Sequence, residues 1–140
     1  METALCHGWI DGQLDRWDEQ FFLTRFTPRG PKSLWSEVNR IAADALIASG
    51  RMMPRGLAEV ERARADGRWD AAYPPQSRAT VPDDLQAALD ADPAAAAAFA
   101  ALSGQRRYAV LHRVHTASAK ARAGRIAKFI GKLARGEPIG

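Results

Sequence analysis

The chain has 140 residues, of which 46% are apolar and 26% are charged. This is the length of one ordinary domain, and the composition is typical of a globular protein and argues against wholesale disorder. No apolar stretch is long enough to cross a bilayer, and the amino terminus lacks the basic flank and apolar run of a secretory signal. The only cysteine, Cys6, excludes an internal disulfide and fits a reducing compartment. We therefore expect a cytoplasmic protein.

The net charge of +4 is unevenly distributed along the chain. Residues 104–140 contain nine Lys or Arg and one acid, Glu137, which gives this region a net charge of +8. Residues 1–103 contain 11 Lys or Arg and 15 Asp or Glu, for a net charge of −4. The basic character therefore belongs to the carboxy-terminal region rather than to the whole molecule.

The amino-terminal pattern predicts a short helical end followed by a β-hairpin. Residues 2–7 have the character of a last helical turn that ends at Gly8, where a left-handed backbone costs little. Aromatic and β-branched residues on both sides of a polar, turn-rich segment predict a hairpin over 9–27. Such a hairpin needs a further strand or a helix to cover it. Pro28 and Pro31 end the second strand.

Residues 33–67 are predicted to form a pair of helices. Ser33 or Ser36 can cap the first helix, which ends at Gly50, and the second runs from Pro54 to Gly67. Apolar residues recur at helical spacing in the first helix and predict one stripe that faces the core. The stripe consists of Leu34, Val38, Ile41, Ala42, Ala45 and Ala48, widened by Trp35 and Leu46.

The carboxy-terminal half is predicted to be helical after a loop. Residues 69–82 contain three prolines and few apolar residues, which predicts a surface loop pinned by Trp69 and Tyr73. Further helices are expected over 83–91, 93–103, 105–115 and 119–135, so that 83–135 forms the carboxy-terminal helices. The fold class is mainly α with a small amino-terminal β-hairpin (α+β). We expect a single domain, 1–140, built as a bundle of about five to six helices.

The residues that could carry metal or nucleophilic chemistry are few. His112 and His115 can share a helix face, but a zinc site needs three or four ligands, and the chain has no Cys-x-x-Cys or His-Glu-x-x-His pairing. We expect the histidines, including His7, at the edge of the core and Cys6 as a small buried hydrophobe. Phosphate-loop and dinucleotide signatures are absent. The sequence thus predicts a protein that is not an enzyme and has no metal or other cofactor.

Polar and aromatic side chains gather near the junction between the hairpin and the first long helix. Two arginines beside a tryptophan can bind a carboxylate or a phosphate. The same side chains can instead fasten the hairpin to the helix, and this structural role is the favoured one. The candidate ligand-binding residues are Trp9, Asp11, Arg25, Arg29, Trp35 and Asn39.

The last predicted helix has an apolar face, with Phe129 at its edge, and a basic face. Three interpretations compete for the basic face: binding of nucleic acid, attachment to an anionic membrane, or a solvated surface that complements the acidic remainder. Nucleic-acid binding usually brings aromatic or base-reading side chains to the basic face, and an alanine-rich apolar face is shallow for a membrane. We expect a solvated surface. The apolar face consists of Ala123, Ile126, Ala127, Ile130, Leu133 and Ala134, and the basic face of Arg125, Lys128, Lys132 and Arg135.

Five segments carry a family resemblance. They are Ala-Leu-Cys-His-Gly-Trp-Ile-Asp-Gly at 4–12, Arg-Phe-Thr-Pro-Arg-Gly-Pro-Lys-Ser-Leu-Trp-Ser-Glu-Val-Asn at 25–39, Gly-Arg-Trp-Asp-Ala-Ala-Tyr at 67–73, Val-Pro-Asp-Asp-Leu-Gln-Ala-Ala-Leu at 81–89 and Arg-Ile-Ala-Lys-Phe-Ile-Gly-Lys-Leu-Ala-Arg-Gly at 125–136. In this order, and over nearly the whole chain, they resemble the bacterial YdeI/OmpD-associated family. The resemblance implies a link to bacteriocin or antimicrobial-peptide protection and to an outer-membrane porin, and it implies no reaction.

The sequence also departs from the family pattern. Relatives usually carry a further amino-terminal segment with a strand and most of the helix that ends here at His7, so the sheet is expected to lack a strand. An export signal in such a segment would allow envelope association. Met53 stands where a capping Thr or Ser is common, and Ser118-Ala119-Lys120-Ala121 replaces a Pro-Glu-Thr start, so the last helix is expected to fray.

The functional hypothesis is a non-enzymatic YdeI/OmpD-associated protein. It would contribute to tolerance of bacteriocins or antimicrobial peptides, a form of stress tolerance, through an unknown protein partner. One alternative is a small-anion or small-molecule binding module at the hairpin-helix junction. The other is nucleic-acid binding through the basic carboxy-terminal helix, which the sequence disfavours.

Overall fold

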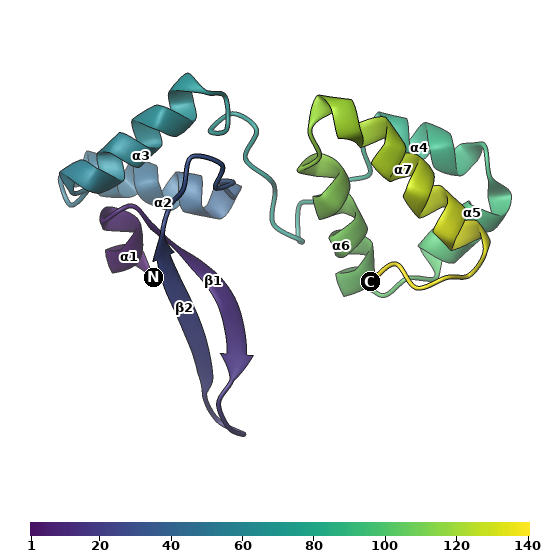
Figure 1. Cartoon of the computed structure of the whole chain (residues 1–140), viewed down its shortest axis with the longest axis horizontal. Helices are drawn as coiled ribbons and strands as arrows, with labels where there is room; N and C mark the ends of the chain where they lie inside the picture. The colour runs from purple at the N-terminus through teal and green to yellow at the C-terminus, as the bar shows by residue number, and fades with distance from the viewer. The chain divides into compact units, whose positions relative to one another are not determined.

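The computed structural model describes all residues from 1 to 140. It contains seven helices and one antiparallel hairpin (Figure 1). The mainly α fold with a small amino-terminal hairpin is therefore confirmed, with seven helices where five to six were expected. The chain divides into two compact units, Met1–Ala72 and Tyr73–Gly140, each with a hydrophobic core of its own. None of the helices has the length and apolarity needed to span a membrane.

The first unit begins with α1 (Glu2–Cys6), β1 (Trp9–Arg16) and β2 (Phe22–Pro28). Gly8 joins α1 to β1 with φ of +74°, a left-handed conformation that glycine adopts without strain. The strands pair antiparallel from Trp9 opposite Pro28 to Arg16 opposite Phe22, with a bulge between Asp11 and Leu14. The hairpin extends away from the helices of this unit (Figure 1). Its backbone hydrogen bonds are thus satisfied by one partner strand only.

Helices α2 (Glu37–Ala48) and α3 (Pro54–Ala65) complete the first unit as expected. Ser36 caps α2 because its hydroxyl accepts a hydrogen bond from the Asn39 amide at 3.1 Å. A side chain at Gly56 in α3 would overlap the carbonyl group of Cys6, so this glycine lets α1 approach α3 closely. The core of the unit gathers buried residues from all three helices and the segments after them. They are Leu5, Cys6, Trp35, Ala43, Leu46, Val60, Ala63, Trp69 and Ala72.

The apolar stripe predicted for α2 is buried only in part. Val38 and Ile41, in the stripe expected to face the core, are 55% and 58% exposed. Leu46 and Trp35, which were expected to widen the stripe, are buried at 3% and 2% exposure, and Ala43, outside the predicted stripe, is fully buried. Helical periodicity identifies residues that share a face, but it does not say which of two apolar faces is covered. Val38 and Ile41 therefore leave an apolar part of α2 open to solvent.

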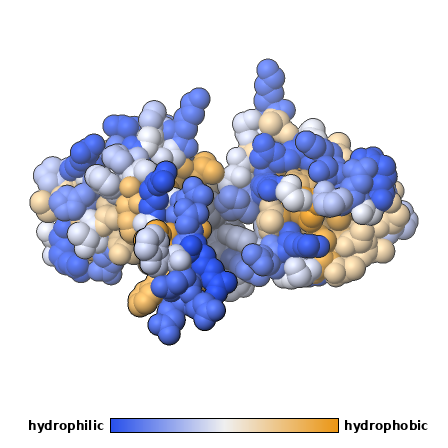
Figure 2. Space-filling view, turned by 60° about the horizontal axis from the view of Figure 1, so that its bottom comes forward, coloured by the Kyte–Doolittle hydropathy of each residue, from blue (hydrophilic) through white to orange (hydrophobic).

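The second unit consists of α4 (Asp83–Asp90), α5 (Pro93–Ala100), α6 (Gly104–His115) and α7 (Ala119–Ala134). Side chains of Asp92, Ser103 and Ser118 cap α5, α6 and α7 by accepting hydrogen bonds from backbone amides. Figure 2 shows a pale, weakly hydrophobic surface at the right of the view. Phe129 was expected at the edge of the apolar face of α7, but it is 6% exposed and central. It packs in the core with Leu85, Leu89, Ala95, Phe99, Val110, Leu111, Val114, Ile126 and Leu133.

Candidate functional site

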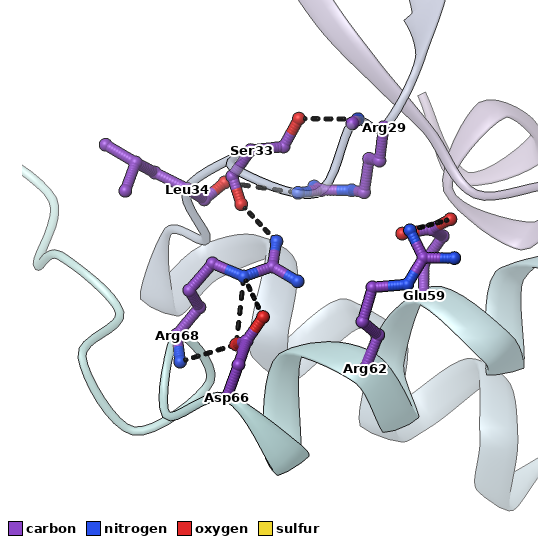
Figure 3. A network of polar contacts seen from close by, with 8 residues as sticks. Arg29, Ser33, Leu34, Glu59, Arg62, Asp66 and Arg68 are labelled. Atoms are coloured by element: carbon purple, nitrogen blue, oxygen red, sulfur yellow. Dashed lines mark hydrogen bonds and ion pairs between the residues drawn. The ribbon is translucent and has the colours of Figure 1, made fainter.

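The end of β2 and the loop after it form a buried polar network (Figure 3). Arg29 is 5% exposed, and its guanidinium carbon lies 3.7 Å from the centroid of the Trp35 ring. One of its terminal nitrogens, Nη1, donates a hydrogen bond to the Leu34 carbonyl at 3.1 Å. A desolvated arginine over a tryptophan face is a strong cation–π contact. Arg29 therefore fastens the hairpin to the start of the helical part.

Arg68 ties the same loop to the end of α3. Its Nη1 donates to the Ser33 carbonyl at 2.8 Å, and its Nε donates to both Asp66 carboxylate oxygens, at 2.9 and 2.8 Å. Desolvation of the Asp66 carboxyl raises its pKa, but the hydrogen bonds from Arg68 and the charge of Arg68 together outweigh it, so that the pKa of Asp66 is lowered. Figure 3 shows Arg29 and Arg68 converging on the segment that carries Ser33 and Leu34. These contacts are those of a structural joint.

A separate recess of about 160 Å³ lies where the base of the hairpin meets α1 and α2. Asp11 and Phe26, which are opposite each other across the two strands, contribute to one wall. A volume near 150 Å³ is enough for a molecule of the size of benzene. Neither the Asp11 carboxylate nor the Asn39 side-chain amide has a hydrogen-bond or ion-pair partner within the chain. The recess is lined by Met1, Glu2, Ala4, Leu5, Trp9, Asp11, Phe26, Val38, Asn39 and Ala42.

The six candidate ligand-binding residues thus fall into three places. Trp9, Asp11 and Asn39 line the recess together. Arg29 and Trp35 stack on each other outside it. Arg25 is exposed on β2, beside the bulge of β1, and belongs to neither group.

Two residues of the recess were not among the candidate ligand-binding residues predicted from the sequence. Phe26 alternates with Arg25 along β2 and therefore faces the other side of the hairpin. Glu2 reaches the rim from α1, where it forms an ion pair of 3.2 Å with Arg51. Strand alternation could have indicated Phe26, whereas nothing in the sequence pattern points to Glu2. Their addition makes the recess aromatic and acidic rather than basic.

The basic side chains of α7 do more than face the solvent. Arg125 donates to the Arg113 carbonyl at 2.9 Å, and Arg122 donates to the Val114 carbonyl at 3.0 Å, so both bind the carboxy-terminal end of α6. Cations are favourable there because the last carbonyls of a helix lack intrahelical partners. Arg122 also binds the Asp84 carboxylate of α4 through two nitrogens, and this hydrogen bonding lowers the pKa of Asp84.

The chain after α7 folds back over part of this basic surface. Lys132 donates to the Pro138 carbonyl at 3.2 Å, and Arg135 binds Glu137, whose pKa is lowered chiefly by that hydrogen bond. Arg125, Lys128 and Lys132 also line a cavity of about 150 Å³ together with Arg113. Lys128 is exposed and makes no hydrogen bond or ion pair. The basic face is therefore partly a set of structural contacts and partly a solvated surface.

The side chains that could carry metal or nucleophilic chemistry are those of one cysteine and three histidines. Cys6 is buried in the first core, at 7% exposure, as expected. His112 packs edge-on against Tyr73 with 4.5 Å between ring centroids, and burial lowers its pKa. No three His, Cys, Asp or Glu side chains lie close enough together to hold a metal ion. Tyr108 donates its hydroxyl to the Pro74 carbonyl, and burial raises its pKa.

These features define a two-unit, mainly α protein with an aromatic, acidic recess on one unit and a basic helical surface on the other. Residues 78–136, most of the second unit, match the family described as bacteriocin-protection, YdeI or OmpD-associated. The predicted family resemblance is confirmed over these residues. Residues 1–59 match a domain of unknown function, DUF8412. Comparisons with curated proteins and with solved structures give no match.

Proposed function

We propose that this protein contributes to bacteriocin protection in a bacterial cell as a binding protein rather than as an enzyme. The observation that carries this proposal is the match of residues 78–136 to a family whose description names bacteriocin protection. The open hairpin and the recess at its base support a binding role, because both present unpartnered groups to solvent. In this role the protein acts through a partner.

The first experiment measures protection in living cells. The whole chain is expressed in a bacteriocin-sensitive strain, and the lowest inhibitory concentration is measured for a panel of bacteriocins, with and without the strain's major porin. We expect the inhibitory concentration of at least one bacteriocin to rise severalfold. The matched control is Val114→Asp, because a charge at this fully buried position should unfold the second unit. Equal protection by this variant, or no protection by the parent, would contradict the proposal.

The second experiment separates binding from catalysis. A bacteriocin against which the chain protects is incubated with the purified chain and then examined by mass spectrometry. A binding protein returns the bacteriocin with its mass unchanged, at any ratio of protein to bacteriocin. Cleavage or modification of many bacteriocin molecules per protein molecule would show turnover and overturn the non-enzymatic assignment.

A specific observation favours a second function, the binding of a small cationic group in the recess. The Asp11 carboxylate has no partner in the chain, and the aromatic side chains of Trp9 and Phe26 stand beside it. A carboxylate with aromatic faces attracts an ammonium group through charge and cation–π contacts. This lining favours a cationic ligand, whereas the sequence suggested a small anion or another small molecule at the hairpin-helix junction. The difference arises because Arg29 packs on Trp35 and does not line the recess.

Titration with butylammonium, followed by amide NMR signals, tests this second function. We expect shifts concentrated at the recess and lost in Asp11→Asn, with retention in Asp15→Asn, which removes a neighbouring carboxylate of β1 outside the recess. Equal responses in both variants would indicate general attraction to an acidic surface. If butyrate instead of butylammonium shifts the amide signals of the recess, the site binds an anion.

A further inference from the structure

The hairpin exposes an unusual amount of apolar surface. Every residue of β2 is exposed, and Phe22 is 61% exposed at its start. At the tip, Trp17 and Phe21 are 69% and 62% exposed. Figure 2 shows a hydrophobic group at one side of the otherwise hydrophilic hairpin. Contiguous exposed apolar patches of this kind mark interaction surfaces, and an isolated two-stranded hairpin is marginally stable.

The two edges of the hairpin differ in how well they are protected. Edge strands usually carry charges that discourage pairing with other strands. β1 carries three charged residues, Asp11, Asp15 and Arg16, and is interrupted by a bulge. β2 carries one charged residue, Arg25, and pairs regularly through its outer half, from Phe22 to Thr24. The open edge of β2 is therefore the one suited to accept another strand.

The sequence of β2 is self-complementary about Thr24. Phe22, Thr24 and Phe26 lie on one face of the strand, because successive side chains alternate between faces. An antiparallel copy centred on Thr24 brings each Phe22 opposite a Phe26 and Thr24 opposite itself. Aromatic pairs and Thr–Thr pairs stabilise adjacent antiparallel strands. The only charge of the strand, Arg25, then lies opposite Leu23 and never opposite a second arginine.

The same register places the tip of each hairpin beside the base of the other. An antiparallel partner reverses the strand direction, so residues before Phe22 lie next to residues after Phe26. The exposed side chains of Trp17 and Phe21 are at the tip, and the exposed stripe of α2, with Val38 and Ile41, belongs to the helical part at the base. The exposed apolar tip of one copy therefore lies beside the exposed apolar stripe of α2 in the other copy.

The apolar area available is sufficient for a specific interface. Burying an aromatic side chain removes about 150–250 Å² from water, and at their exposures Phe21, Phe22 and Phe26 offer about 300 Å² between them. Four aliphatic residues of the hairpin and α2, each more than half exposed, add further apolar area. One side of a standard interface buries about 800 Å², of which a little over half is apolar. These aliphatic residues are Leu14, Leu23, Val38 and Ile41.

We propose that the β2 edge binds β2 of a second copy of this chain, antiparallel about a two-fold axis at Thr24. The two hairpins then form one continuous four-stranded sheet. The pairing is isologous, since the same residues are buried on both copies. It covers the open edge of β2 and the aromatic face beside it, and it stabilises a hairpin that has no third strand within its own chain.

Crosslinking tests the register directly. In the Thr24→Cys variant of the whole chain, the two introduced thiols lie about 5 Å apart at the axis, so a short thiol-to-thiol crosslinker should join most of the protein into dimers. The matched control is Gln13→Cys on the opposite, β1 edge, where the two thiols are separated by three strand spacings, about 14 Å. The natural Cys6 is buried and does not compete. Failure of the Thr24→Cys variant to crosslink, or equal crosslinking of both variants, overturns the proposal.

Light scattering after gel filtration tests the association without a crosslinker. We expect a mass of twice the 15.3 kDa chain for the parent and for Gln13→Lys. Thr24→Lys should reduce the mass to one chain with an unchanged far-ultraviolet spectrum, because two like charges then meet at the axis. A monomeric parent at about 100 μM, or a dimer that Thr24→Lys leaves intact, overturns the proposal. So does a monomer whose β2 signals change only when a bacteriocin is added, since that assigns the edge to another partner.

Discussion

Arg29, just after the hairpin, lies over the ring of Trp35, just before α2, with 3.7 Å between the guanidinium carbon and the indole centroid. Trp35 in turn packs against Trp69, with ring centroids 5.0 Å apart. One side of the hairpin-helix joint is thus a cluster of an arginine and two mutually tilted tryptophans in the core. An arginine buried in this way contributes to packing and is not accessible to an anion from solution.

The first prediction concerns this joint. Arg29→Ala should lower the free energy of unfolding of the first unit by about 2–3 kcal/mol, because it removes a desolvated cation–π contact and the hydrogen bond to the Leu34 carbonyl. Urea unfolding followed by tryptophan fluorescence measures it, since all four tryptophans lie in residues 1–72. The control Arg25→Ala, on the exposed strand, should change stability by no more than about 0.5 kcal/mol. Equal losses of unfolding free energy in the two variants would show that Arg29 has no special structural role.

Local signals made much of this fold predictable. The cap at Ser36 and the positive φ of Gly50 and Gly67 depend on residues next to each other in sequence, and the limits predicted for α2 and α3 followed from them. The face that α2 buries depends on what packs against it, and the sequence pattern could not supply that. Val38 and Ala43 differ little in hydrophobic pattern, yet one is 55% exposed and the other is fully buried.

The candidate site was predictable in part for the same reason. Trp9, Asp11 and Asn39 lie together, since strand alternation and the hairpin-helix junction bring them near one another. Arg25 and Arg29 were grouped with them by proximity in sequence. The strand ends between these two, at Pro28, so one stays on the exposed hairpin and the other turns into the core. Charge and spacing alone do not distinguish these two environments.

The second prediction concerns the start of α7. Ser118→Ala should destabilise the second unit by about 1 kcal/mol, because it removes the hydroxyl that accepts from the Ala121 amide at 3.3 Å. Ser118→Asp should restore the stability, since aspartate is an equally good cap and its charge favours the helix amino terminus. Thermal unfolding followed through the ring signals of Tyr73 and Tyr108, the only tyrosines and both in the second unit, measures it. No difference between Ala and Asp would mean that the first turn of α7 frays in solution.

The third prediction concerns pH. Burial lowers the pKa of His112 in the folded protein, helped by the charges of His115 and Arg113. The unfolded chain therefore takes up a proton at a higher pH than the folded one, and stability falls as pH drops through about 6.5, the ordinary histidine value. The loss levels off once the pH is below the folded pKa.

Replacing this side chain should remove the effect. His112→Phe should flatten the dependence of unfolding free energy on pH between about 7 and 5, whereas His7→Gln, at an exposed position of the first unit, should leave the slope of the second unit unchanged. Urea unfolding at a series of pH values, followed through the tyrosine ring signals, makes the comparison. If the unfolding free energy of His112→Phe still depends on pH as strongly as that of the parent, another titratable group causes the dependence.

The fourth prediction concerns the basic face of α7, for which the solvated interpretation remains our expectation. Lys128 makes no hydrogen bond or ion pair, and Lys132 holds only the Pro138 carbonyl at 3.2 Å, so Lys128→Glu with Lys132→Glu should preserve the fold and change stability by about 0.5 kcal/mol or less. A surface of this kind attracts DNA or RNA weakly and without regard to sequence. Each phosphate that a cation neutralises releases counterion, so the attraction should disappear as salt approaches physiological concentration.

The measurement is a salt titration of binding to a short duplex and to a single strand. The parent is compared with the double variant and with Arg25→Glu combined with Arg55→Glu, which changes the net charge equally at exposed positions of the first unit. If only net charge matters, both double variants should weaken binding to a similar extent at low salt, and none of the three proteins should bind near physiological salt, about 0.15 M. Parental binding that persists at that concentration, and that only the α7 reversals abolish, would instead make α7 a nucleic-acid site, because a local phosphate contact depends on where the cations stand.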